Sequence, residues 1–192
     1  MAIACAMAGI ITGIIMGSGL GFRISSILTT VAGHSMLLLL VLTMIVSLIM
    51  GMGVPTTAAY LVLAALVAPT LTKLGLSPMA AHLFILYFGC ISSVTPPVAM
   101  AAYAGAAIAG CDPNKCGYKA FRLAFCAFII PYMFVYNPVL LMDGGVLAIL
   151  QCIITALAGA YLLGSGFEGF FFSWKITMAE RLLLLAGAML LI

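Results

Sequence analysis

Long apolar runs follow one another along the chain, separated by short breaks rich in glycine, proline or charge. The runs occupy residues 2–17, 24–50, 56–72, 79–93, 98–110, 120–141, 146–163 and 182–192. A bilayer core of about 30 Å needs about 20 helical residues, so some runs can cross it and others are too short. The final run is among the short ones, and we expect the chain to end within a helix. This pattern predicts an all-α integral membrane protein, built as a helix bundle.

The first strong break reads GMGVPTT and begins at Gly51. Gly51 and Gly53 can adopt backbone conformations closed to other residues. Pro55 suits the start of the next helix, where its missing N–H costs nothing. An ordinary loop between two spans is the alternative, but the following run, 56–72, is short and hardly any charge lies near the break. We therefore interpret residues 34–72 as a re-entrant helical hairpin whose tip lies within the membrane.

The second strong break reads SSVTPP and begins at Ser92. Pro96 and Pro97 cannot continue an α-helix through it. The two flanking runs are each too short to cross a bilayer, although together they are long enough. A proline kink in a continuous span is the alternative, which a double proline beside three hydroxyls disfavours. We predict that residues 79–110 form one discontinuous transmembrane helix.

Breaks inside a membrane matter because backbone N–H and C=O groups there need partners. Paired, interrupted segments of this kind point to the binding site of a secondary transporter. Helix C-termini offer carbonyls to a cation and N-termini offer N–H groups to an anion. We expect carbonyls and hydroxyls at the breaks to bind Na⁺, with the candidates Gly51, Gly53, Val54, Thr56, Ser92, Ser93 and Thr95. We expect substrate contacts from Pro55, Thr57, Pro96, Pro97 and Tyr103, with packing as the alternative role for the tyrosine.

Composition and charge support a membrane protein and suggest its orientation. The 192 residues are 66% hydrophobic and 6% charged, against about 45–50% and 25% in soluble domains. Arg23 and Lys73 are expected on one side of the membrane. The other side, predicted to be cytoplasmic by its excess of basic residues, would carry Lys115, Lys119, Arg122, Lys175 and Arg181. No acidic residue lies centrally in a span, which favours Na⁺ over H⁺ as the coupling ion.

Other classes of function find little support in the sequence. No H-E-x-x-H motif, pair of intramembrane aspartates or Ser/His pair in a suitable context indicates an enzyme, so no catalytic residue and no cofactor are predicted. A channel would repeat polar positions along a helix, whereas polarity here concentrates at two points. A structural or channel-type membrane subunit without independent transport remains the alternative. We interpret the six cysteines as small apolar residues of the bundle.

The stretches GMGVPTTAAYLVLAALVAPTL, LGLSPMAAHLF, SSVTPPVAMAAYAGAAIAG and FVYNPVLL resemble the large membrane subunit of TRAP (tripartite ATP-independent periplasmic) transporters. The fused class, in which the small and large membrane subunits form one chain, is the most similar. The resemblance implies Na⁺-driven uptake of organic acids, often carboxylates, by an elevator-like domain. It also implies a periplasmic substrate-binding protein as partner. The expected location is a bacterial or archaeal cytoplasmic membrane, crossed several times.

The resemblance also suggests how the chain is divided. The large subunit of this family has two inverted repeats, each with a hairpin and a broken helix, and this chain supplies one such set. Residues 1–141 would be the C-terminal repeat, and 142–192 would hold further spans and an interfacial segment around Trp174. The remaining repeat and the small membrane subunit are therefore expected partners. One set alone would form half of the binding cavity.

Overall fold

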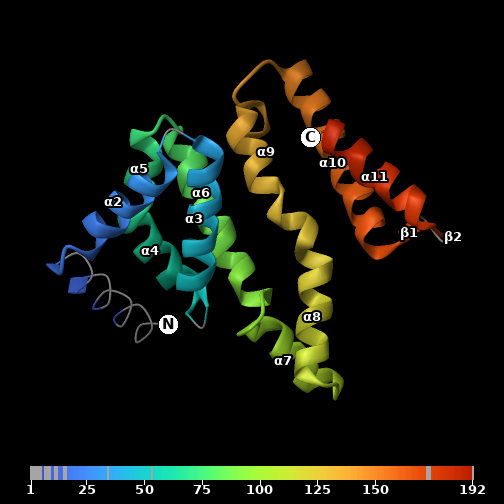
Figure 1. Ribbon diagram of the computed structural model, residues 1–192, viewed down its shortest axis with the longest axis horizontal. Coiled ribbons are helices and arrows are strands. Elements are labelled where there is room, and N and C mark those ends of the chain that lie inside the picture. Colours follow the sequence, from blue (N-terminus) through green and yellow to red (C-terminus); the bar gives the residue numbers. More distant parts are fainter. Residues whose placement is uncertain are drawn as a thin grey trace. The chain divides into compact units, whose positions relative to one another are not determined.

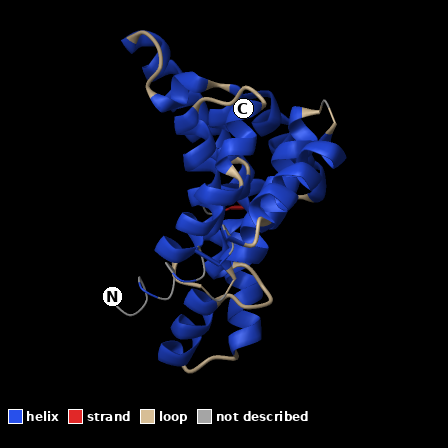
Figure 2. Cartoon of the chain, turned by 90° about the vertical axis from the view of Figure 1, so that its left-hand side faces the viewer, coloured by secondary structure: helices blue, strands red, loops and turns tan. Residues whose placement is uncertain are grey.

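The described part of the chain is almost entirely helical (Figure 2). The computed structural model describes residues 6, 10, 13, 14, 17–33, 35–52, 54–171 and 174–191. Two compact units divide the chain, Met1–Gly117 (unit 1) and Tyr118–Ile192 (unit 2). In the described ranges two helices are long and apolar enough to cross a membrane, Pro113–Tyr136 and Val146–Glu168. The architecture is consistent with the predicted all-α membrane protein.

Unit 1 contains both predicted breaks and the helices around them. Its elements are α2 (Leu20–Ala32), α3 (Met36–Gly51), α4 (Thr56–Leu66), α5 (Ala68–Lys73), α6 (Pro78–Ile91), the 3-10 turn η1 (Ser92–Val94) and α7 (Met100–Ala109). The run 56–72 is divided into α4 and α5, because Pro69 has no N–H to continue the ladder of hydrogen bonds. After the second break the helix resumes at Met100 rather than at residue 98.

Serine side chains fix where two of these helices start. Ser35 precedes α3, and its Oγ accepts a hydrogen bond from Leu38 N at 3.4 Å. Ser77 precedes α6 in the same way, accepting from Ala80 N at 3.2 Å. Each cap satisfies a backbone donor that the first helical turn leaves unpaired. The arms that lead into the two breaks therefore both begin at a capping serine.

The core of unit 1 lies where α6 packs against α3 and α4 (Figure 1). Phe84 and Phe88 of α6 are completely buried there, with ring centroids 4.9 Å apart in an edge-to-face arrangement. Leu40 of α3 and Leu63 of α4 are completely buried as well. Helices α3, α4 and α6 thus share one apolar core.

The span that follows unit 1's breaks begins earlier than predicted. We expected residues 120–141, but the helix starts as α8 (Pro113–Ala124) and continues through η2 (Phe125–Phe128) into α9 (Ile130–Tyr136). Asp112 explains the early start, because its Oδ1 accepts hydrogen bonds from Asn114 N at 2.8 Å and Lys115 N at 3.1 Å. This N-cap draws the polar stretch before Lys119 into the helix.

The rest of unit 2 consists of a long helix and a shorter one that packs against it (Figure 1). After η3 (Pro138–Leu141) come α10 (Val146–Glu168), the antiparallel strands β1 (Phe170–Phe171) and β2 (Trp174–Lys175), and α11 (Met178–Leu191). The predicted interfacial segment thus divides into the end of α10, the strand pair and the start of α11. The predicted apolar run 182–192 belongs to α11 over its described residues.

Two hydrogen bonds from Thr177 to Glu180 define the start of α11. Glu180 Oε2 accepts hydrogen bonds from the backbone N and the hydroxyl of Thr177, at 2.7 and 2.9 Å. These bonds to the carboxylate lower the pKa of Glu180.

Close approach of α11 to α10 depends on Gly166, where a Cβ would lie 3.0 Å from the side chain of Leu185.

Two of the six cysteines differ from the prediction that all of them are small apolar residues of the bundle. Cys111 and Cys116 form a disulfide, so that interpretation is wrong for this pair. The start of α8 explains the pairing, because the turn of chain between α7 and α8 brings these two positions together. Among the described residues, the free thiols are Cys90, Cys126 and Cys152, and Cys5 lies outside them.

Replacing Phe84 by alanine is expected to destabilise the protein by about 3–5 kcal/mol, because the substitution leaves a cavity in the core of unit 1. The measurement is SDS-induced unfolding of the purified chain, followed by circular dichroism. Met79→Ala on the same helix is the control, because the Met79 side chain is 63% exposed. Equal destabilisation by the two substitutions would contradict the packing described here.

Candidate functional site

The first break is a tight turn between α3 and α4. Helix α3 ends at Gly51, and Met52 leaves the helix in an extended conformation, with φ −67° and ψ 123°. Val54 N donates to Gly51 O at 3.5 Å, which closes the turn. Pro55 then takes the position before α4, which begins at Thr56. Gly53, a predicted Na⁺ ligand, lies outside the described residues.

The start of α4 exposes its first turn. Pro55 precedes the helix, and no side chain caps the backbone N–H groups that follow. Pro55, Thr56 and Thr57 are all exposed. A helix N-terminus of this kind presents unpaired donors and the positive end of the helix dipole.

The second break interrupts the chain between α6 and α7. After η1, Thr95 is extended, with φ −94° and ψ 125°. Pro96 and Pro97 follow, joined by a cis peptide bond, and Ala99 has a positive φ of 28° before α7 begins. Neither proline can donate a backbone hydrogen bond to the preceding turn. In a continuous helix their N–H groups would pair with Ser92 O and Ser93 O, and Ser92 O accepts instead from Thr95 N at 3.2 Å.

Three side-chain hydroxyls donate to the last carbonyls of α6. Ser92 Oγ donates to Gly89 O at 2.7 Å, and Ser93 Oγ donates to Cys90 O at 2.7 Å. Thr95 Oγ1 donates to Ile91 O at 2.9 Å, completing the series. The proton of each hydroxyl is directed back at a carbonyl. What each oxygen still offers is its acceptor lone pairs, and these suit a cation rather than an anion.

The two breaks meet in space. A Cβ at Gly51 would overlap Ser92 Oγ and would lie 2.9 Å from Ser92 Cβ and 3.2 Å from Gly89 O. Ser92 is 1% exposed and Thr95 is 7% exposed. The C-terminal ends of α3 and α6 are thus in direct contact, and only a residue without a side chain fits at position 51.

The remaining predicted site residues lie around this contact at different depths. Val54, Ser93 and Pro96 are half-buried, whereas Pro97 is exposed. The Tyr103 hydroxyl donates to Pro97 O at 2.8 Å, which ties α7 to the break. Its ring packs near Gly117, where a Cβ would lie 3.0 Å from Tyr103 Cε1. The predicted packing alternative for this tyrosine thus has direct contacts, and its substrate role stays a prediction.

Two further hydroxyls, Thr43 and Ser47, are absent from the sequence-based prediction. Both are completely buried in α3, and neither side-chain oxygen has a hydrogen-bond partner among the described residues. Their spacing places them one turn apart on the same face of α3 as Gly51. That four-residue spacing of small and hydroxyl residues in an apolar helix is the signal that would have identified them.

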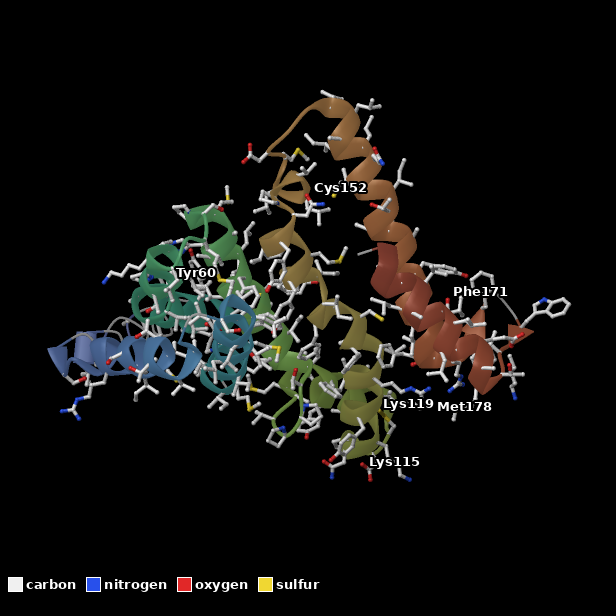
Figure 3. All side chains as sticks on the ribbon, turned by 45° about the horizontal axis from the view of Figure 1, so that its top comes forward. Tyr60, Lys115, Lys119, Cys152, Phe171 and Met178 are labelled. Carbon is white, nitrogen blue, oxygen red and sulfur yellow. A yellow bond between two sulfur atoms is a disulfide. The ribbon has the colours of Figure 1, made fainter. Side chains whose placement is uncertain are left out.

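A polar contact between the arms also escaped the prediction. The Tyr60 hydroxyl on α4 lies 3.0 Å from His82 Nδ1 on α6, and this hydrogen bond is partly buried. Tyr60 is labelled in Figure 3. The pair links α4 to α6. It therefore holds in register the two segments that approach the breaks.

Interrupted apolar helices, together with two helices long and apolar enough to cross a membrane, are typical of membrane transport proteins. The family described as "Tripartite ATP-independent periplasmic transporter, DctM component" matches residues 1–149. The chain belongs to this family, in agreement with the resemblance of its motifs, and it is a TRAP transporter permease component. Comparison with curated proteins and with solved structures gave no match.

Gly51→Ala is expected to lower the thermal stability of the chain in detergent, because the added methyl group collides with Ser92. Overpacking of this kind costs about 1–3 kcal/mol. Gly105→Ala in α7 is the matched control, since a Cβ there meets nothing within 4 Å. Adding Ser92→Gly to Gly51→Ala removes the colliding atoms and should restore part of the loss. Equal melting temperatures for the two single variants would contradict the close contact.

Proposed function

We infer that the chain supplies half of the binding site of a Na⁺-coupled permease that takes up organic acids, most suitably carboxylates. In this proposal residues 34–72 are a re-entrant hairpin and residues 79–110 are a discontinuous transmembrane helix. The observation that carries the proposal is the contact of Gly51 with Ser92, which joins the two helix breaks.

The cation would lie where the C-terminal ends of α3 and α6 meet. The oxygens proposed as ligands belong to the backbone at Gly51, Val54 and Thr95, to the hydroxyls of Ser92, Ser93 and Thr95, and to Thr56 at the start of α4. Gly53, a further proposed ligand, lies outside the described residues. Na⁺ is a hard cation that prefers such oxygen ligands. The two helix C-termini add partial negative charge. Because no Asp or Glu occurs before Asp112, this site has no titrating carboxylate, which favours Na⁺ over H⁺.

The substrate carboxylate would face the N-terminal ends of α4 and α7. Uncapped N–H groups at a helix start bind anions together with the helix dipole. Pro55 and Thr57 lie at the start of α4. Pro96, Pro97 and Tyr103 lie at or near the start of α7. A cation bound between the breaks would strengthen the attraction of both helix starts for a carboxylate, which couples the two ligands.

The family supplies the setting for this half-site. A tripartite periplasmic transporter implies a periplasmic substrate-binding protein and further membrane subunits. We place the chain in a cytoplasmic membrane, crossed several times. Its partners in this proposal are that binding protein, the other permease repeat and the small membrane subunit.

Thr95→Val is expected to weaken Na⁺ binding about tenfold or more, because the substitution keeps the shape of the side chain and removes an oxygen. A bond to a charged group contributes about 1.5–3 kcal/mol. The first readout is stabilisation of the full chain against heat by NaCl relative to KCl. The second is Na⁺-dependent uptake of radiolabelled organic acids by the complete permease and its binding protein in proteoliposomes, where Pro97→Ala should also slow transport.

Thr72→Val is the matched control for this experiment. Thr72 Oγ1 likewise donates to helix carbonyls, those of Ala68 and Pro69, but it lies at the base of the hairpin. The assignment fails if Thr95→Val and Thr72→Val show the same Na⁺ dependence. Flux that neither saturates with substrate nor needs Na⁺ would favour the channel-type alternative instead.

A further inference from the structure

Unit 2 contains an open groove between the α8–η2 segment and α10. Its volume is about 390 Å³. Arg122, Leu123 and Cys126 line one wall, and Ala160, Gly164 and Glu168 are among the residues that line the other. The proposed transport site does not include this groove, which lies wholly within unit 2.

The groove is polar at one end and apolar at the other. On α8, Lys119, Arg122 and Leu123 follow the spacing of one helical face, and Cys126 continues it in η2, so charge gives way to apolar side chains along this wall. Lys119 is exposed and is labelled on α8 in Figure 3. The opposite wall changes in the same direction, from Glu168 at the end of α10 to Ala160 deeper along it. An amphiphile fits such a gradient, whereas a small soluble anion would fill only the polar end.

The polar end carries an excess of positive charge. Arg122 Nη2 donates to Phe167 O at 2.9 Å, and its Nε lies 3.5 Å from Glu168 Oε1, although the side chain remains 54% exposed. The Arg181 guanidinium lies directly against Gly169, at the same end of α10. Four basic side chains and two acidic ones gather at this end, namely Lys119, Arg122, Lys175, Arg181, Glu168 and Glu180. Glu168 is paired with Arg122. The basic side chains still outnumber the acidic ones, and an external anion can neutralise this net positive charge.

Aromatic side chains beside the polar end mark it as a membrane interface. Trp174 is 80% exposed, and Phe170, which also lines the groove, is 47% exposed. Phe171 packs edge-to-face on Tyr161 at a centroid distance of 5.7 Å, and Figure 3 labels it on the strand pair after α10. Exposed tryptophan and phenylalanine next to basic residues are typical of the headgroup region.

We propose that this groove binds one anionic phospholipid, with the headgroup phosphate at Lys119 and Arg122 and an acyl chain along Leu123, Cys126, Ala160 and Gly164. Arginine and lysine are the usual partners of phosphate groups. The apolar part of the groove selects a lipid over a free anion. The bound lipid would cover the open side of the contact between α8 and α10 and would stabilise unit 2.

The test is native mass spectrometry of the full chain, released from detergent with phosphatidylglycerol or phosphatidylcholine of identical acyl chains. Phosphatidylglycerol should be retained preferentially. Each basic residue near the membrane surface contributes about 1 kcal/mol, so Lys119→Gln and Arg122→Gln should each weaken retention about fivefold. Lys119→Gln is the cleaner variant, because Arg122 also holds the end of α10. Lys73→Gln in unit 1 is the control with the same change in charge.

A second variant separates a lipid from a free anion. Gly164→Leu keeps every charge and fills the apolar part of the groove, so it should reduce retention of phosphatidylglycerol while the chain melts at an unchanged temperature without lipid. The proposal is overturned if both lipids are retained equally, or if Lys119→Gln behaves like Lys73→Gln. It is also overturned if Gly164→Leu has no effect and inorganic phosphate displaces the lipid, which would identify a simple anion site.

Discussion

The backbone groups freed where α6 ends are the constraint on which the candidate site depends. The two prolines after Thr95 carry no N–H, so the ladder of helical hydrogen bonds cannot continue through them. The hydroxyls of Ser92, Ser93 and Thr95 donate to the last carbonyls of α6, where the helix ends. Because their protons point inward, their oxygens face outward as acceptors. The same bonds that permit the break thus determine the kind of ligand it suits.

Close packing joins the end of α6 to the turn between α3 and α4. Gly51 lets the end of α3 touch Ser92, and the apolar core of Phe84, Phe88 and Leu63 keeps the arms together. The buried hydroxyls of Thr43 and Ser47 work against this packing, since an unpaired buried hydroxyl costs about 1–3 kcal/mol. The face of α3 that leads to Gly51 is therefore less stable than its apolar neighbours alone would make it.

The sequence predicted the helical class, the positions of both breaks and the family, because glycine, proline and hydroxyl residues have strong local effects in an apolar chain. It did not predict the contact of Gly51 with Ser92, which depends on how two helices distant in sequence pack. The early start of α8 was missed because Asp112 was interpreted as a loop residue rather than a helix cap. Thr43 and Ser47 were missed because their four-residue spacing with Gly51, which places all three on one face of α3, was not used. The groove of unit 2 was not predicted, because Arg122 and Glu168, which pair beside it, are 46 residues apart in the sequence.

Two helix C-termini in this chain are satisfied in opposite ways, and the difference explains why they suit different ligands. The carbonyls at the end of α6 are paired by neutral hydroxyls, so the negative end of its dipole remains uncompensated. At the end of α10 the Arg122 guanidinium donates to Phe167 O, and its charge is partly offset by Glu168 at 3.5 Å. In our proposals the first arrangement suits a cation, and the second, with its further basic side chains, suits an anion. The ligand class proposed for each end thus follows from the charge of the side chains around it rather than from the helix itself.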